Sequence, residues 1–114
     1  MVVDRIAARL FVGNETLHAP HLLDIEVAHV LRRYSLSGEL DPERGAAAIQ
    51  DLADMPLQRC PHGPLLERIW EIRSRLTAYE AAYVALAEAL DAPLLTRDRK
   101  LASSAGHGAV IELL

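Results

Sequence analysis

Residues 75–102, RLTAYEAAYVALAEALDAPLLTRDRKLA, decide the fold of this 114-residue chain. Thr77 and Glu80 have the spacing of a capping box, so we expect a helix that begins there and ends near Leu90. An Asp-Ala-Pro turn follows, and residues 94–96, Leu-Leu-Thr, are expected to form a short strand. Helix and strand therefore alternate in this stretch, which favours an α/β fold.

The rest of the chain continues the same alternation. Residues 21–35 carry apolar side chains at the spacing of one helical face, which predicts a helix with a buried stripe. An Asp-Pro-Glu sequence at residues 41–43 supplies a cap, a first-turn proline and a first-turn acid for a helix to about residue 54. The other expected elements are helices at residues 5–12, at 64–76 and around residue 100, and strands at 16–19, 57–60 and 109–113. Strands separated by helices favour a parallel sheet.

Length and composition limit the class of protein. With 114 residues, the chain is expected to form a single domain, residues 1–114, that holds a core without disulfides. The lone Cys60, the lack of a signal peptide and the lack of a long apolar run indicate a cytoplasmic protein outside the membrane. The net charge of −4 is not that of a general nucleic-acid binder, although it does not exclude a local basic patch.

Three acids lie at positions where chemistry could gather. Asp98 comes just after the predicted strand 94–96, Glu80 lies in the first turn of its helix, and Glu26 lies beside the apolar stripe. Self-repulsion would oppose a cluster of three carboxylates unless a divalent cation sat between them. Because oxygen ligands without Cys or His suit Mg²⁺ better than Zn²⁺, the pattern is compatible with a magnesium site.

Each acid also has a structural alternative. Glu80 could merely complete its capping box, and Asp98 could cap the short helix that follows it. Glu26 could pair with a basic neighbour on its own helix, Arg33 or His29. Spacing alone therefore leaves both the metal cluster and the structural roles open.

Three stretches resemble the PIN domains of VapC toxins, the ribonuclease halves of bacterial toxin-antitoxin pairs. They are ETLHAPHLLDIEVAHVLRR (15–33), RLTAYEAAYVALAEALDAPLLTRDRKLA (75–102) and the terminal AVIELL (109–114). The resemblance covers about residues 10–114 and is most specific over residues 76–101. It implies a PIN-like three-layer α/β/α sandwich with a short, mostly parallel sheet whose first strand is clipped or missing.

The same resemblance implies a function and a site. The chain would be the toxin of a type II toxin-antitoxin system, an endoribonuclease that hydrolyses RNA phosphodiester bonds with Mg²⁺ or Mn²⁺. Glu26, Glu80 and Asp98 match the acids of the family pattern and would hold the metal. The implied partners are a cognate antitoxin protein, the RNA substrate and a second copy in a homodimer.

Two departures from the family pattern affect the metal site. Glu80 stands where the family usually has the shorter Asp. The family also begins with a central strand that ends in an essential Asp, and this chain is about one helix shorter in that region. Either residues 1–3 are the clipped first strand and Asp4 is a metal ligand, or Asp4 caps the helix 5–12 and the first strand is absent or lies upstream.

These departures leave a second function open, a catalytically degenerate PIN-like module that binds an antitoxin or another toxin. Arg97, Arg99 and Lys100 flank Asp98 and could either contact RNA phosphates or be ordinary solvated charges. Trp70 and its apolar neighbours are expected to make core or dimer contacts rather than to stack on bases, because the chain has few aromatic residues.

Overall fold

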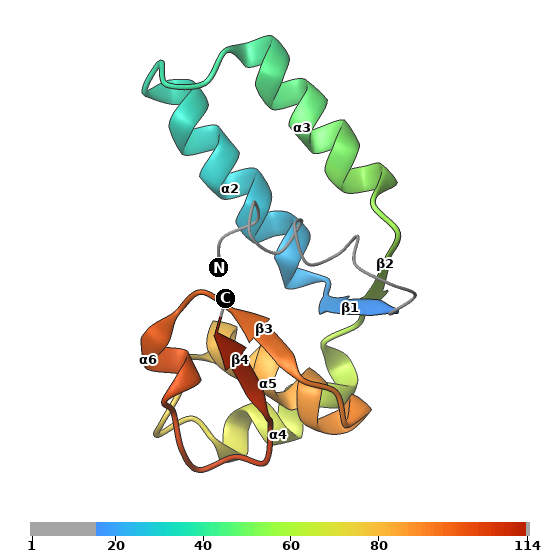
Figure 1. Ribbon diagram of the computed structural model, residues 1–114, viewed down its shortest axis with the longest axis vertical. Helices are drawn as coiled ribbons and strands as arrows, with labels where there is room; N and C mark the ends of the chain where they lie inside the picture. Colours follow the sequence, from blue (N-terminus) through green and yellow to red (C-terminus); the bar gives the residue numbers. More distant parts are fainter. Residues whose placement is uncertain (1–15, 114) are drawn as a thin grey trace.

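The computed structural model describes residues 16–113 (Figure 1). Its helices are α2 (Leu22–Leu36), α3 (Pro42–Asp54), the 3₁₀ turn η1 (Gly63–Leu65), α4 (Leu66–Glu71), α5 (Ala78–Leu90) and α6 (Arg99–Ala102). Its strands are β1 (Leu17–Pro20), β2 (Leu57–Cys60), β3 (Leu94–Thr96) and β4 (Ile111–Leu113). The helix expected at residues 5–12 lies outside the described residues.

The strands form two parallel pairs. β1 pairs with β2 in the register Leu17 to Leu57, and β3 pairs with β4 in the register Leu94 to Ile111. The prediction of an α/β fold with parallel pairing is therefore confirmed. Within residues 16–113, however, the two pairs are separate sheets and not one continuous sheet.

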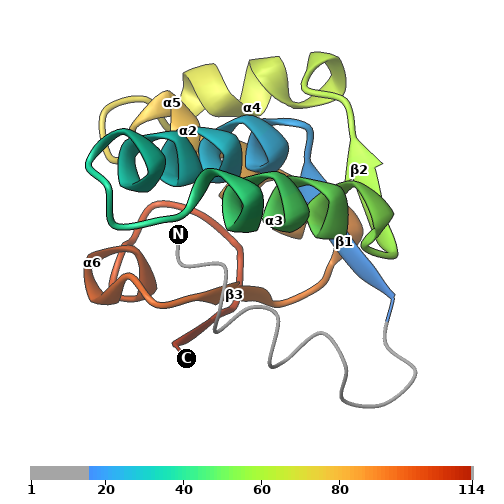
Figure 2. The same ribbon diagram turned by 90° about the horizontal axis from the view of Figure 1, so that it is seen from above.

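Helix α5 holds the two strand pairs together. It packs against both β1 and β3, and seven consecutive residues, Ala81–Ala87, are buried. Its side chains contribute to each of the three hydrophobic clusters found among the described residues. Figure 2 shows α4 and α5 together on one side of β3, while α2 and α3 form a hairpin that projects from the strands in Figure 1.

The three long helices were predicted correctly because their ends carry local signals. The Asp41 side chain accepts a hydrogen bond from the Glu43 amide at 3.4 Å, and Pro42 occupies the first turn of α3. Both hydrogen bonds of the predicted capping box are present at the start of α5. The stripe on α2 is correct at its first half, where Leu23 and Val27 are buried.

Other predictions were wrong where tertiary packing prevails. The helix expected over residues 64–76 ends at Glu71, and the chain then turns so that Ile72 and Leu76 both reach the same hydrophobic cluster. Of the two roles predicted for Trp70, the core contact is wrong, because 68% of its surface is exposed, and the dimer contact stays a prediction. Tyr34 is 44% exposed, because the far end of α2 projects from the strands with α3.

Two strand ends also differ from the prediction. Pro20, expected to stop the first strand, is the last residue of β1, and the amide of the next residue, His21, donates to the Cys60 carbonyl at 2.9 Å. The last strand begins at Ile111 instead of residue 109, because the Ala109 amide donates to the His107 ring and not to a strand. Among residues 16–113 there is no helix with the length and apolar character needed to span a membrane.

Candidate functional site

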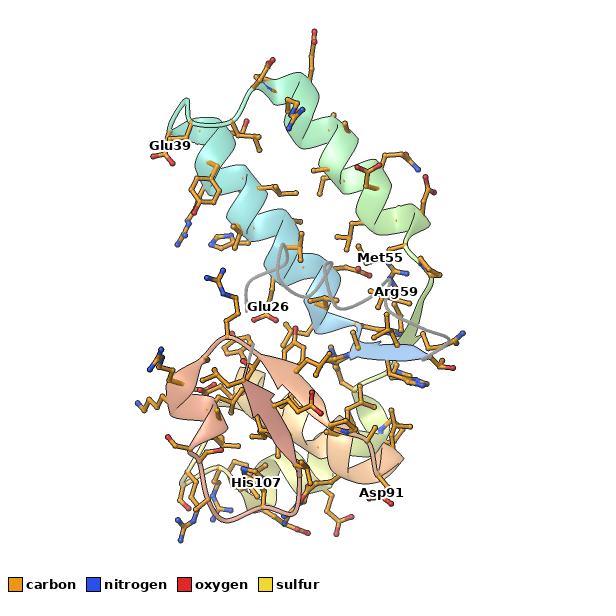
Figure 3. The ribbon with its side chains drawn as sticks, viewed as in Figure 1. Glu26, Glu39, Met55, Arg59, Asp91 and His107 are labelled. Atoms are coloured by element: carbon orange, nitrogen blue, oxygen red, sulfur yellow. The ribbon has the colours of Figure 1, made fainter. Side chains whose placement is uncertain are left out.

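Glu26 is held by a buried tyrosine. It lies half-buried on α2, and its Oε1 accepts a hydrogen bond from the hydroxyl of Tyr83 on α5. Figure 3 shows the Glu26 carboxylate pointing from α2 toward the half of the molecule that carries β3 and α6. Burial, followed by the Glu26 carboxylate and the charge of Asp24, raises the pKa of Tyr83 well above its usual range. Tyr83 is therefore a permanent donor to Glu26 at neutral pH, and this contact replaces the pairing with Arg33 or His29 considered from the sequence.

Glu80 performs its structural role. Its Oε1 accepts from the Thr77 amide at 2.9 Å, and its own amide donates to the Thr77 hydroxyl at 3.1 Å. These two bonds satisfy two of the donors that would otherwise be left unpaired at the start of α5. The capping box predicted at Thr77 and Glu80 is thus confirmed, and it fixes the Glu80 side chain in one orientation.

Asp98 is also a cap. Its Oδ1 accepts from the amides of Lys100 and Leu101 at 2.9 and 3.2 Å, which starts α6. Its own amide donates to the hydroxyl of Thr96, a buried residue at the end of β3. Asp98 is therefore anchored just beyond the carboxyl end of a parallel strand, the edge at which open α/β sheets place their functional groups.

The three acids have suitable chemistry for a divalent ion but do not gather. Each uses one oxygen in the contacts above, and within residues 16–113 the second oxygen of each has no hydrogen-bond partner. Oxygen donors of this kind are those that Mg²⁺ and Mn²⁺ accept. The described part of the chain nevertheless contains no group of three or more His, Cys, Asp or Glu side chains that could hold a metal ion. Asp4, the fourth predicted ligand, lies outside the described residues.

A cavity of about 420 Å³ lies between the two strand pairs. It is bordered by residues of β1, by residues 92–95 at the start of β3, and by the α5 side chains Tyr83, Leu86 and Leu90. Its lining is mainly apolar, so it is unsuited to phosphate groups. Tyr83, the partner of Glu26, lines the cavity, which also borders β1, the strand before Glu26, and β3, the strand before Asp98.

The role of Tyr83 was not predicted from the sequence, although a signal was present. Tyr83 is the aromatic residue with a polar tip inside the apolar run AAYVALA, residues 81–87. A buried hydroxyl needs an acceptor, and an acid beside another apolar stripe, Glu26, is the kind of partner that it finds. The acceptor is 57 positions away in the chain, so the pair itself could not be identified from local spacing.

The family of proteins to which this chain belongs follows from comparison with known sequences. The PIN domain family matches residues 2–106, a span that includes all four predicted acids. The chain therefore belongs to the PIN-domain family.

Within that family, its relatives are named as VapC ribonucleases. The chain is 49% identical over 110 residues to Ribonuclease VapC1 of Mycobacterium tuberculosis (strain ATCC 25618 / H37Rv), which covers 96% of this chain and 83% of the relative. It is 45% identical over 97 residues to Ribonuclease VapC9 of the same strain, covering 85% and 76%. It is 39% identical over 109 residues to Ribonuclease VapC12, covering 96% and 83%. The chain belongs to this VapC group.

Proposed function

We propose that the chain is the toxin of a type II toxin-antitoxin system and an endoribonuclease that hydrolyses RNA phosphodiester bonds. The observation that carries the proposal is the family match over residues 2–106, because it spans every acid on which the chemistry would depend. The relatives that are 39–49% identical carry the name ribonuclease. The anchoring of Glu26, Glu80 and Asp98 by separate hydrogen bonds supports it as well.

We further propose that Asp4, Glu26, Glu80 and Asp98 hold Mg²⁺ or Mn²⁺. When bound, such an ion supplies an activated water and stabilises the negative charge that develops on the phosphate. The protein's contribution is orientation, since a donor fixes one oxygen of each described acid and leaves the other oxygen available. The proposal requires the three described acids to come together, because they do not form a group within residues 16–113.

We propose a cognate antitoxin and a second copy of the chain as protein partners, in the cytoplasm. Large apolar side chains are exposed along the α2–α3 hairpin: Ile25 at 68%, Tyr34 at 44%, Leu36 at 70% and Ile49 at 42%. Exposed apolar surface of this kind marks protein interaction sites. An antitoxin helix or a second toxin subunit would cover it.

One observation favours the degenerate module as the second candidate. Glu80 and Asp98 are both engaged as helix caps, and the described residues form no group of three metal ligands. Acids retained only for capping would give a stable PIN-like domain without catalysis. That domain would still present the α2–α3 surface to an antitoxin or another toxin.

Amide substitutions separate the two candidates because they keep the structural contacts. Gln at position 80 still completes a capping box, and Asn at position 98 is as good a cap as Asp. The carbonyl of Gln at position 26 still accepts from Tyr83. We expect Asp98→Asn, Glu80→Gln and Glu26→Gln to retain the wild-type unfolding curve and to lose metal-dependent RNA cleavage.

The matched control is Glu39→Gln. Glu39 is an exposed acid in the turn between α2 and α3 (Figure 3), far from Glu26 along the hairpin. This variant should cleave labelled single-stranded RNA in Mg²⁺ or Mn²⁺ as the wild type does, and chelator should stop both. Unchanged cleavage by Asp98→Asn would contradict the assignment of Asp98. A wild type that cleaves nothing with either metal would support the degenerate module instead.

A further inference from the structure

A polar groove runs beside the start of α5. Its volume is about 710 Å³, and it lies between the segment that joins α4 to α5 and the end of α6. Only two of the ten residues that line it are apolar. The lining residues are Arg73, Ser74, Arg75, Leu76, Thr77, Glu80, Lys100, Ser103, Ser104 and Ala105. We call this surface the basic groove.

The basic groove has a positive charge on an acidic protein. Arg73, Arg75 and Lys100 contribute three positive charges and Glu80 one negative charge, whereas the whole chain has a net charge of −4. Among residues 16–113, the side chains of Arg75 and Lys100 have neither an ion-pair nor a hydrogen-bond partner. Both are exposed. Two cations are therefore available in the groove for an anionic ligand.

The position of Arg75 depends on a glycine. A Cβ on Gly106 would lie 2.1 Å from the Arg75 Cδ, so the arginine stem packs directly over the glycine backbone in the loop between α6 and β4. Gly106 has a φ of +88°, a conformation that side-chain-bearing residues rarely adopt. The loop thus gives the arginine stem a close-fitting surface against which to lie.

An aromatic side chain stands next to the groove. The guanidinium of Arg73 lies 4.3 Å from the centroid of the Trp70 ring and donates to the Trp70 carbonyl at 2.8 Å. Trp70 remains 68% exposed, although an indole of this size is usually covered in a folded protein. Proteins bind single-stranded nucleic acids with this combination of an exposed aromatic ring and neighbouring cations. The bases stack on the ring, and the phosphates contact the cations.

We infer that the basic groove binds the sugar-phosphate backbone of single-stranded RNA through Arg73, Arg75 and Lys100, with a base stacked on Trp70. The inference deepens the proposed ribonuclease function and rests on it for the choice of RNA. Glu80 lines the same groove, so a strand lying there passes directly along one of the predicted acids. An acidic protein segment is the less suitable occupant, because only Leu76 and Ala105 would offer it apolar contact.

The test measures RNA binding without cleavage. A fluorescein-labelled single-stranded RNA of mixed sequence is titrated with the full chain in chelator, at several salt concentrations. Each neutralised phosphate contact should lower the salt slope by about 0.7 and weaken binding about fourfold at 0.15 M salt. The triple variant Arg73→Gln, Arg75→Gln, Lys100→Gln should therefore lower the slope by about 2 and the affinity by about 50-fold.

Two further variants make the test specific. Arg44→Gln removes an exposed cation of α3 that has no partner within the described residues, and it should leave affinity and slope unchanged. Trp70→Ala should weaken RNA binding about tenfold, since stacking contributes about 1–3 kcal/mol per base. The salt slope should stay unchanged, because the indole ring carries no charge. Equal losses in Arg44→Gln and the triple variant would overturn the inference, as would an unchanged salt slope in the triple variant.

Failure of this inference and failure of the proposed function give different results. If the triple variant cleaves RNA with an unchanged KM, the ribonuclease proposal is supported and the basic groove is not the RNA-binding site. If the groove variants lose RNA binding but the wild type cleaves no RNA, the groove is supported and the catalytic proposal fails. A poly-glutamate peptide that binds the wild type as tightly as RNA does, with the same loss in the triple variant, would overturn the choice of RNA.

Discussion

Replacing Tyr83 with Phe removes one hydroxyl from the contact that holds Glu26. Tyr83 is 8% exposed and donates to a carboxylate that is only half-buried. A hydrogen bond to a charged group contributes about 1.5–3 kcal/mol, and water reaches part of Glu26 in the variant. We therefore expect a loss of about 1.5–2 kcal/mol in the free energy of unfolding. At roughly 4 °C per kcal/mol for a chain of this size, Tm should fall by about 6–8 °C.

The assay is urea unfolding followed by circular dichroism, with Tyr79→Phe as the matched control. Tyr79 is on the same helix, is 65% exposed and has no hydroxyl partner within residues 16–113. Removing the Tyr79 hydroxyl should change the free energy of unfolding by less than about 0.5 kcal/mol. A phenolate absorbance titration adds a second measurement. Because the pKa of Tyr83 is raised, the phenolate absorbance that the wild type develops around pH 10 should not decrease when Tyr83 is replaced with Phe.

The sign of the pH dependence follows from the same shift. A group whose pKa is raised on folding contributes fully to stability below its unfolded pKa, about 10 for tyrosine, and loses that contribution as the pH rises through the folded value. The stability difference between wild type and Tyr83→Phe should therefore be constant from about pH 7 to 9. Equal losses of stability in Tyr83→Phe and Tyr79→Phe would refute the contact, as would a phenolate signal near pH 10 that is smaller in Tyr83→Phe than in the wild type.

Two further contacts give predictions of their own. The Arg59 guanidinium pairs with Asp24 at 2.8 Å and donates to the Leu52 carbonyl at 2.6 Å. Since the side chains of Arg59 and Asp24 are only 24% and 35% exposed, Arg59→Met should lower the free energy of unfolding in urea by about 2 kcal/mol. A change below about 0.5 kcal/mol would contradict this role. The hydrogen bond from the Arg68 guanidinium is the main cause that holds the pKa of the Glu88 carboxyl below its usual value. The stability that the Arg68–Glu88 pair contributes is present above about pH 4.3 and is lost as the pH falls further. The stability difference between the wild type and Arg68→Gln should therefore shrink in acid. A difference that stays constant down to about pH 3 would count against the pair.

The sequence predicts those elements whose causes are local. The capping box at Thr77 and Glu80 and the Asp-Pro pair at 41–42 act within three residues, so the starts of α5 and α3 could be predicted from the sequence. The early end of α4 has no such signal, because the turn after Glu71 exists to bring Ile72 and Leu76 into a cluster with distant residues. Tertiary packing prevails over helical periodicity at that point.

The candidate site was predictable in its residue types but not in its contacts. The acids were found by pattern and resemblance, and the capping roles of Glu80 and Asp98 by spacing. The Tyr83 partner of Glu26 required the fold, because the two residues come together only when α5 packs against β1, the strand that leads into α2. Arg73 and Arg75 were missed for the same reason: they join Lys100 in one groove although some 25 residues separate them in the chain.

The buried alanines of α5 limit which substitutions the helix tolerates. Glu26 follows β1 and Asp98 follows β3, while α5 packs against both strands and carries Glu80. The thickness of that helix therefore acts as a spacer between the acids. A change such as Ala81→Val, at a residue with 0% exposure, would widen the spacer by the size of two methyl groups. Substitutions of residues that are not themselves acids could thus abolish toxicity in a growth screen while the purified protein still folds.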